Sequence, residues 1–311
     1  KLPSQSLATS PFVPVINHAL NIKASSIHLN GMPGAKVFVP PVLAGFVGSD
    51  HLAFLYAIGF GKDKRTRLGI DIGTNTEIAL QHGERIVSCS TASGPAFEGA
   101  QIRFGMRAAP GAIEHISITK DGNAKCEVIG NKSAIGICGS GILDAIAELH
   151  RNHITNSRGR LDKSHKKVKL DVNGKPTFVL VAENDNQQEI TISQHDIDQI
   201  LLAKGAIRAG ADILMNYLHV NPREIEDVVI AGAFGSYMNP EHAIDIGMLP
   251  SINIDKVHAV GNAAGTGARM MLISTNARKE ACQLAERIEY LELTTYPDFA
   301  IFFANGIRSS S

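Results

Sequence analysis

The feature of this chain that most limits its fold is the repetition of glycine-rich turns beside short apolar runs. Such turns occur at residue 73 and at residues 139–141, 232–235 and 261–267. A short apolar run is typical of a buried strand, and a glycine at its end lets the backbone approach a helix or a ligand closely. In open α/β sheets ligands bind at the carboxyl ends of the strands. We therefore expect an α/β protein in which these turns converge on one cleft.

The first of these turns lies inside a predicted hairpin. Apolar residues 68–72 and 77–80 flank the turn 73–76, and Asp71 stands near the end of the first strand. Backbone N–H groups and hydroxyls in such a turn can cradle a phosphate, and a carboxylate at the strand end can hold Mg²⁺ or orient a water. An ordinary hairpin whose polar side chains only make turn hydrogen bonds is an equally weighted alternative at this point.

Composition and charge narrow the class of protein. The 311 residues are 44% hydrophobic and include 29 glycines, which fits an α/β chain of one large domain or two lobes. The 30 basic residues balance the 30 acidic ones, so net charge gives no reason to expect a nucleic acid or an anionic membrane as partner. No apolar stretch approaches the roughly 18 residues of a membrane helix and no signal peptide opens the chain, which predicts a cytoplasmic location.

The four cysteines show no CxxC and no ferredoxin spacing. We therefore expect that this chain does not hold an iron–sulfur cluster by itself. Joint ligation of a group by Cys126 and Cys138 is an alternative to buried reduced thiols, which are the favoured interpretation.

Two glycine motifs come close to nucleotide-binding fingerprints without meeting them. Around Lys62 the P-loop pattern fails, because Tyr56 stands where its first glycine is required and Asp63 follows the lysine. Residues 139–141 lack the third glycine of the dinucleotide fingerprint, since Asp144 occupies its position. The bare N–H groups at this predicted helix start can take a phosphate or simply allow close packing.

The rest of the chain alternates between predicted strands and helices. Ser193, with Asp196 at the capping-box position, predicts the start of a long core helix, and residues 155–195 read as an insertion. The other predicted elements are a helix near 15–22, a strand at 35–39, a helix at 51–58, a strand at 84–89, a hairpin of 113–119 with 125–129, a helix at 142–149, a short β pair at 178–182 and 189–192, strands at 227–231 and 256–260, a helix at 268–274, and a C-terminal strand and helix.

A small, polar segment at residues 90–100 follows the strand predicted at 84–89. It is rich in glycine, proline and hydroxyl side chains, so we do not expect it in the core. Beside a phosphate hairpin, such a segment is either a solvated connection or a contact for a ligand or partner.

The order of these elements resembles a known superfamily. Hairpin, third strand, helix, long helix, strand, strand and helix match the ribonuclease H-like unit of the actin, sugar kinase and Hsp70 ATPases. Residues 71–76 look like the phosphate hairpin of that superfamily, and residues 230–235 look like its adenosine motif. The resemblance implies an α/β protein with a ribonuclease H-like fold that binds ATP and Mg²⁺.

A closer resemblance is to the ATP-dependent reductive activators of corrinoid proteins. The runs that carry it are spread over nearly the whole chain, at 40–50, 71–76, 91–103, 138–142, 203–210 and 231–235. The resemblance implies that ATP hydrolysis is coupled to low-potential electron delivery, which returns an inactive cobalt(II) corrinoid protein to cobalt(I). The [2Fe–2S] domain of that family lies N-terminal and its cysteine motif is absent here, which implies the ATPase and partner-recognition part alone.

The residues and the resemblance together assign roles. Asp71 is the candidate catalytic residue and the candidate ligand of Mg²⁺. The candidate nucleotide contacts are Gly73, Thr74, Asn75 and Thr76 for phosphate, Glu77 beside them in the same cofactor-binding set, Gly139, Ser140 and Gly141 for phosphate or lobe packing, and Gly232, Ala233 and Gly235 for the adenosine side. The candidate contacts with the corrinoid protein are Ser90, Thr91, Ser93, Phe97 and Glu98.

An internal comparison predicts the domain organisation. The strand at 37–39 with its following glycines and helix parallels the strand at 257–260 with its own glycines and helix. We therefore expect residues 68–311 to form a complete second unit and residues 1–67 to be the C-terminal part of a first one. Insertions are expected near 91–130 and 155–195.

The first unit's own hairpin is missing from this arrangement. The chain opens with Lys1, which agrees with a fragment or a processed product. The prediction is thus an N-terminally truncated two-unit domain in which Asp71 holds only half of a nucleotide site.

Two other functional classes remain open. A small-molecule kinase of the same superfamily would need a substrate pocket and a catalytic base near the cleft. A non-hydrolysing interaction module would bind the corrinoid protein without any dependence on ATP. The sequence does not define the methyl-donor pathway or the oligomeric state, and a homodimer is left open.

Overall fold

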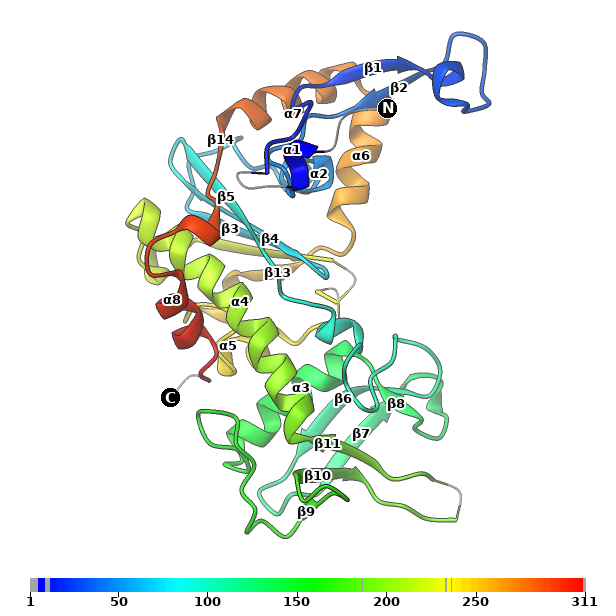
Figure 1. The fold of residues 1–311 in the computed structure, drawn as a ribbon, viewed down its shortest axis with the longest axis vertical. Coiled ribbons are helices and arrows are strands. Elements are labelled where there is room, and N and C mark those ends of the chain that lie inside the picture. Colours follow the sequence, from blue (N-terminus) through cyan, green and yellow to red (C-terminus); the bar gives the residue numbers. More distant parts are fainter. Residues whose placement is uncertain (1–4, 9–11, 186, 233, 236, 310–311) are drawn as a thin grey trace.

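The structure, a computed structural model, describes residues 5–8, 12–185, 187–232, 234–235 and 237–309. Its largest sheet in this part of the chain has the strand order β13-β12-β3-β4-β5-β14 (Figure 1). These strands are β3 (Arg67–Ile72), β4 (Thr76–His82), β5 (Arg85–Thr91), β12 (Asp227–Ala231), β13 (Val257–Ala259) and β14 (Ile288–Tyr290).

The central sheet has the predicted ribonuclease H-like topology. β3, β4 and β5 form an antiparallel meander, while β12 and β13 run parallel to β3. β14 adds a parallel strand beside β5 at the other edge. The α/β fold class is therefore confirmed, and the parallel strands bring their carboxyl ends to the edge where the β3–β4 turn lies.

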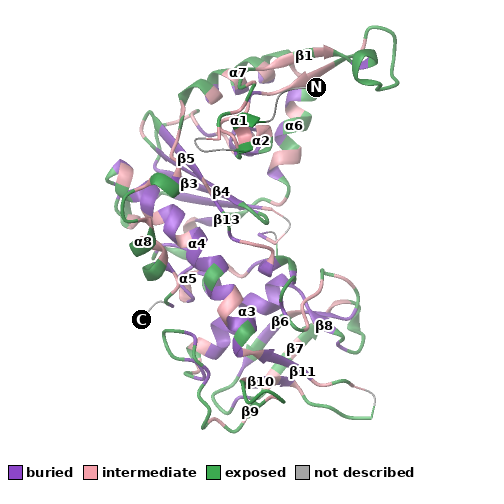
Figure 2. Cartoon of the chain, in the orientation of Figure 1, coloured by how far each residue is buried: buried purple, intermediate pink, exposed green. Residues whose placement is uncertain are grey.

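Each face of this sheet is covered by helices. Leu68, Ile70 and Ile72 of β3 face the long helix α4 (Gln194–Leu218) in the larger hydrophobic core. The opposite face packs against α2 (Ser49–Ala57), α6 (Ala263–Ile273) and α7 (Thr275–Arg287) in a second core. Figure 2 shows the buried residues concentrated along the central strands and α4. The alternation of side chains along each strand decides which residues belong to which face.

The helix α4 begins as predicted. The side chain of Ser193 accepts a hydrogen bond from the backbone N–H of Asp196, and the backbone N–H of Ser193 donates to Asp196 Oδ2 at 2.8 Å. This reciprocal capping box provides acceptors for two backbone N–H groups that have no partner inside the helix. Near its middle α4 packs against α8 (Phe299–Gly306), where a Cβ atom on Gly306 would lie 2.7 Å from the carbonyl oxygen of Gly205.

Two smaller sheets and a helix form a peripheral lobe below the central sheet (Figure 1), and much of the ranges 91–130 and 155–195 lies in this lobe. One sheet, which we call the peripheral sheet, has the order β7-β6-β8, with β6 (Ala112–Ile118), β7 (Ala124–Val128) and β8 (Gly136–Ile137). It is covered by α3 (Gly139–Arg151). Another sheet has the order β11-β10-β9, with β9 (Val168–Leu170), β10 (Pro176–Val181) and β11 (Ile190–Ser193).

Three local predictions were wrong or incomplete. The helix expected near 15–22 is instead the strand β1 (Leu20–Lys23), which pairs antiparallel with β2 (Lys36–Val39). The helix expected at 268–274 begins five residues earlier, at Ala263. The helix α7 and the short helices α1 (Gln5–Ala8) and α5 (Pro240–Asp245) were not predicted.

No helix in the described ranges is both long enough and apolar enough to cross a membrane.

A buried ion pair joins the starts of β3 and β12. Arg67 donates from Nε and Nη2 to Asp227 Oδ2, at 2.9 and 2.8 Å, and both side chains are largely buried. Replacing Asp227 by alanine would leave the Arg67 charge without its partner, so we expect a loss of about 3 kcal/mol in the free energy of unfolding, measured by urea denaturation. The control is Lys64→Ala, which breaks the exposed pair Lys64–Glu84. If Asp227→Ala loses no more free energy of unfolding than Lys64→Ala, the prediction is wrong.

Candidate functional site

The predicted glycine turns meet at one end of the central sheet. Gly232, at the end of β12, has a positive φ of 98°, and a Cβ atom there would lie 2.2 Å from the carbonyl oxygen of Ile72. Only glycine allows this approach to the strand that ends in the hairpin turn. The N–H of Gly232 also donates to Gly261 O at 3.2 Å, which joins the turn after β13 to the same place. These three turns therefore lie together, and their convergence on one cleft stays a prediction.

The start of α3 packs into this end of the sheet. A Cβ atom on Gly139 would lie 2.1 Å from the carbonyl oxygen of Phe97, and one on Gly141 would lie 2.5 Å from that of Ile113. Phe97 stacks on Phe234 with ring centroids 4.6 Å apart. Close packing accounts for these two glycines, and Ser140 between them is buried. A phosphate contact by residues 139–141 stays a prediction.

The hairpin turn is held from outside by the segment 91–99. Ser93 Oγ lies 2.8 Å from Thr76 Oγ1 and 3.1 Å from Gly73 O. Thr74 Oγ1 donates to Glu98 Oε1 at 2.5 Å, and the N–H of Gly94 donates to Thr74 O at 2.9 Å. The conformation of the turn is thereby fixed before any ligand arrives.

The residues of the turn differ in their access to solvent. Gly73, Thr74 and Asn75 are exposed, so their backbone can meet an anion. Thr76 is fully buried, and its hydroxyl is engaged by Ser93 rather than facing solvent. Of the predicted adenosine residues, Gly232 and Gly235 adjoin the end of β12, while Ala233 lies outside the described residues.

The five predicted partner contacts divide by burial. Thr91, Ser93 and Phe97 are each 5% exposed or less, so their side chains lie inside this conformation. Ser90 is partly exposed and Glu98 is exposed. The Ser90 hydroxyl also donates to Glu77 Oε1 at 3.1 Å. The part of the segment that a partner can reach is therefore smaller than the sequence predicted.

Carboxylates gather on the sheet face that α2 covers. Asp71 pairs in register with Glu77 across β3 and β4. Burial, together with the negative charge of Asp50 on α2, raises the pKa of Asp71 to about 6. Burial, together with repulsion from Asp50 and Asp71, raises the pKa of Glu77 to about 8. Repulsion between these groups favours a cation among them.

The start of α2 is pinned above this row of side chains. His51 is 1% exposed, and its Nε2 lies 2.8 Å from the hydroxyl of Ser88 on β5. Burial lowers the pKa of His51 to about 3, so the ring is neutral. Because the Ser88 hydroxyl donates to Ile78 O at 3.0 Å, it accepts from His51. Asp50 is thus a site carboxylate that sequence reasoning missed, and its position at a helix start beside Gly48 was the available signal.

The donor set fits a magnesium ion that enters with phosphates. Hard carboxylate oxygens are the ligands Mg²⁺ prefers, and it is usually held by one or two carboxylates together with substrate phosphates. Within the described ranges, no group of three or more His, Cys, Asp or Glu residues is placed to hold a metal ion by itself. Asp71 is the residue that would hold it, and the ion would supply charge neutralisation for a bound triphosphate. The four cysteines are unpaired thiols, with Cys89 and Cys138 buried and Cys126 and Cys282 partly buried.

Substituting Glu77 by glutamine tests the electrostatics of this face. With the folded-state pKa raised to about 8 from an ordinary 4.5, the stability linked to Glu77 is present below pH 4.5 and is lost as pH rises through 8. Glutamine carries no charge, so Glu77→Gln should gain stability relative to wild type as the pH rises. The difference in their free energies of unfolding should grow by about 2 kcal/mol between pH 6 and pH 9, measured in buffer that contains no divalent ions. The exposed Glu127→Gln is the matched control, and parallel pH curves for wild type and Glu77→Gln would refute the assignment.

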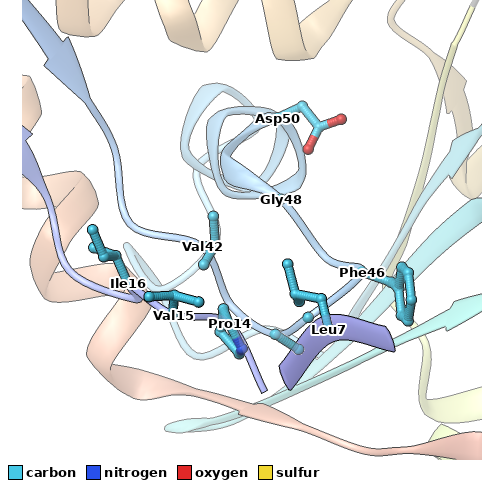
Figure 3. Close-up of a pocket in the computed structure, with 10 residues that line it drawn as sticks. Leu7, Pro14, Val15, Ile16, Val42, Phe46, Gly48 and Asp50 are labelled. Atoms are coloured by element: carbon cyan, nitrogen blue, oxygen red, sulfur yellow. The ribbon is translucent and has the colours of Figure 1, made fainter. Parts of the chain in front are cut away.

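A pocket of about 430 Å³ opens beside Asp50 (Figure 3). Its wall comes from the N-terminal segment, including Leu7, Pro14 and Val15, and from the connection between β2 and α2 with Phe46. Among the described residues that line it, Asp50 alone is charged and none is a predicted nucleotide contact. The candidate site is therefore the hairpin end of the sheet and not this apolar pocket.

Comparisons with known proteins agree with this geometry. The family model described as the C-terminal domain of RACo, the ASKHA domain, matches residues 65–308, and the model of the RACo middle region matches residues 1–63. The chain is 38% identical over 306 residues to the corrinoid activation enzyme RamQ of Eubacterium limosum, covering 94% of this chain and 51% of that protein. It is 28% identical over 295 residues to a [Co(II) methylated amine-specific corrinoid protein] reductase of Methanosarcina barkeri, covering 88% and 51%.

A solved structure matches the whole described fold. It is titled reductive activator for corrinoid, iron–sulfur protein, with a TM-score of 0.88 and 34% identity over 98% of this chain and 49% of that one. The chain thus spans about half the length of the relatives it matches.

Proposed function

The chain belongs to the family of the RACo C-terminal ASKHA domain, and we propose from this membership that it is the ATP-binding and partner-recognition part of a reductive activator of corrinoid proteins. In this proposal, ATP hydrolysis drives reduction of an inactive cobalt(II) corrinoid protein to cobalt(I). The electrons would come from a [2Fe–2S] cluster on another domain. Since the chain spans about half of its relatives, their activities enter here as a proposal.

One observation carries the proposal. The hairpin with Asp71, the turn at Gly232 and the turn at Gly261 meet at the carboxyl end of a ribonuclease H-like sheet. The exposed backbone of residues 73–75 lies beside carboxylates that repel one another. An Mg²⁺-bound triphosphate supplies both the anion for the turn and the cation for the carboxylates.

The packing of α2 supports the proposed two-unit organisation, in which residues 1–67 complete a preceding unit. A Cβ atom on Gly267 of α6 would lie 1.9 Å from the carbonyl oxygen of Ala53 on α2, so the two helices touch backbone to backbone. The two helices also follow the two parts of the internal sequence repeat. We propose that the remaining half of the nucleotide site belongs to that preceding unit.

The experiment that tests this function mixes the protein with a cobalt(II) corrinoid protein, with and without Mg·ATP. We expect Mg·ATP to strengthen the complex and the corrinoid protein to increase phosphate release. Complex formation and phosphate release that do not affect one another would contradict the activator function.

The exposed part of the segment 90–98 is the proposed partner contact. Replacing Ser90 and Glu98 by alanine should weaken complex formation by about tenfold, because both are accessible beside the hairpin. The matched control is Ser117→Ala on β6, an exposed serine of the peripheral sheet. Unchanged complex formation and unchanged cobalt(II) spectra in the double variant would argue against this contact.

A further inference from the structure

A single buried carboxylate joins α3 and β6 of the peripheral lobe to α5. Asp144 on α3 is 2% exposed. Its Oδ1 accepts from Nδ1 of His242 on α5 at 2.6 Å. Its Oδ2 accepts from Nδ1 of His115 at 3.0 Å and from the N–H of Ile116 at 3.3 Å, both on β6. A carboxylate oxygen accepts hydrogen bonds, so these three N–H groups donate to Asp144, and each of its two oxygens has a partner.

The hydrogen-bond network assigns the tautomer of His242. Arg151 Nη1 lies 3.2 Å from His242 Nε2, and an arginine can only donate. Nε2 therefore carries the lone pair and Nδ1 carries the proton, which it donates to Asp144. Glu148 Oε1 is the other charged neighbour of this ring, 3.7 Å from Nε2. His242 itself is 6% exposed.

The arginine fastens the rest of α5 to α3. Arg151 donates from Nε to Asp245 and forms an ion pair with Glu241 at 3.2 Å. A six-residue helix makes few internal hydrogen bonds, so contacts outside the helix decide where it lies. α5 is thus held to α3 through both its first and its last turn.

α5 ends the loop that carries the predicted adenosine residues. This loop, residues 232–239, leaves β12 at Gly232 and enters α5 at Asn239, whose side chain accepts from the N–H of Glu241 at 3.0 Å. Residues 233 and 236 of the loop lie outside the described ranges. One end of the loop is fixed by the sheet, and the other end is fixed by α5 and its attachment to Asp144.

We propose that Asp144 and His242 are a positioning pair that holds α5, and with it residues 237–239 at the end of this loop, in place for nucleotide binding. The pair acts through α5 and touches no ligand itself. The inference deepens the proposed function and rests on it for the identity of the ligand. The two residues are 98 positions apart in the sequence and lie on different helices, so no local sequence motif could predict the pair.

Three variants and a matched control test the pair in the full chain. His242→Leu removes the bond to Asp144, and His242→Asn places an amide donor where Nδ1 stood. Arg151→Met removes the donor to Nε2 of His242. Because Arg151 is more exposed than His242, this variant can be tested even if His242→Leu folds poorly. His115→Ala removes a donor from the same carboxylate without touching α5.

Two readouts separate the inference from the proposed function. In the protein without nucleotide, hydrogen–deuterium exchange in residues 234–239 should rise at least tenfold in His242→Leu and Arg151→Met, and stay near wild type in His242→Asn and His115→Ala. In phosphate release, the KM for Mg·ATP should rise about tenfold in the first two variants, with kcat within twofold of wild type. A general loss of stability would not be reversed by asparagine at position 242, and it would not raise KM while leaving kcat unchanged. These two results therefore distinguish positioning of the loop from destabilisation of the fold.

The outcomes are distinct. Exchange and KM that match wild type in a folded His242→Leu would overturn the positioning pair, and the same result in Arg151→Met would overturn the role of α5 in holding the loop. A wild-type protein that binds no Mg·ATP would overturn the proposed function, while the exchange measurement would still decide whether the pair holds the loop.

Discussion

Replacing Asp71 by asparagine is expected to lower ATP-dependent phosphate release by about 100-fold, because a metal-held charge contributes several kcal/mol to phosphoryl transfer. Asparagine keeps the size of the side chain, and the β3 pairing with Glu77 and Ala231 runs through the backbone and is retained. The loss should therefore come from the carboxylate and not from the fold. Phosphate release is measured with the corrinoid protein present, at saturating Mg·ATP.

Magnesium dependence gives this prediction a second test. In the wild type, binding of a fluorescent ATP analogue should tighten when Mg²⁺ is added, and Asp71→Asn should lose most of that response. Without Mg²⁺ the variant should bind at least as well as wild type, since removing Asp71 relieves repulsion among the carboxylates. Asp121→Asn, at an exposed hairpin tip, is the matched control. A normal magnesium response in Asp71→Asn would remove Asp71 from the site.

The parts of the fold that the sequence predicted are those with local causes. The hairpin around Asp71 follows from alternating apolar residues and a glycine turn, and the start of α4 follows from Ser193 and Asp196 three residues apart. The meeting of the glycine turns was also predictable, because the carboxyl ends of parallel strands share one edge of a sheet.

The parts that the sequence did not predict depend on distant contacts. α6 begins at Ala263 although Gly265 and Gly267 favour a turn, since Gly267 lets α6 touch the backbone of Ala53. β1 forms because β2 offers a partner strand 13 residues further along the chain, counted from Lys23 to Lys36. Local propensities carry no information about either contact, so the sequence pattern could not predict the start of α6 or the strand β1.

The same limit applies to the candidate site. Asp50 joins Asp71 and Glu77 because α2 packs on this face of the sheet, where His51 also contacts Ser88. The burial of Ser93 and Phe97 likewise depends on partners elsewhere, Thr76 for the first and Phe234 for the second. The expectation that residues 90–100 stay out of the core was wrong, because β5 continues to Thr91 and because Ala96 and Phe97 are buried in the larger core. Polar composition could not tell which side chains of this segment face the protein.

A buried lysine on α4 should dominate the pH dependence of stability above neutrality. Lys204 is fully buried, and its ammonium donates to the carbonyl oxygen of Arg308, after α8. Burial, together with the nearby charge of Arg208, lowers the pKa of Lys204 to about 7 from an ordinary 10.5. The unfolded chain therefore binds this proton more tightly than the folded one, so stability rises with pH between 7 and 10.5.

Replacing Lys204 by methionine removes this dependence, because methionine fills similar space without a charge. We expect Lys204→Met to be more stable than wild type at pH 7, and its advantage in free energy of unfolding to shrink by about 4 kcal/mol by pH 10. At pH 10 the lost hydrogen bond to Arg308 should make the variant slightly less stable than wild type. Other groups that titrate in this range are common to both proteins, so the difference between their denaturation curves isolates Lys204. The control is Lys120→Met at an exposed position, whose difference from wild type in free energy of unfolding should not change with pH. If the difference for Lys204→Met is also independent of pH, the prediction is wrong, and Lys204 stays charged in the folded protein through a partner that the fold supplies.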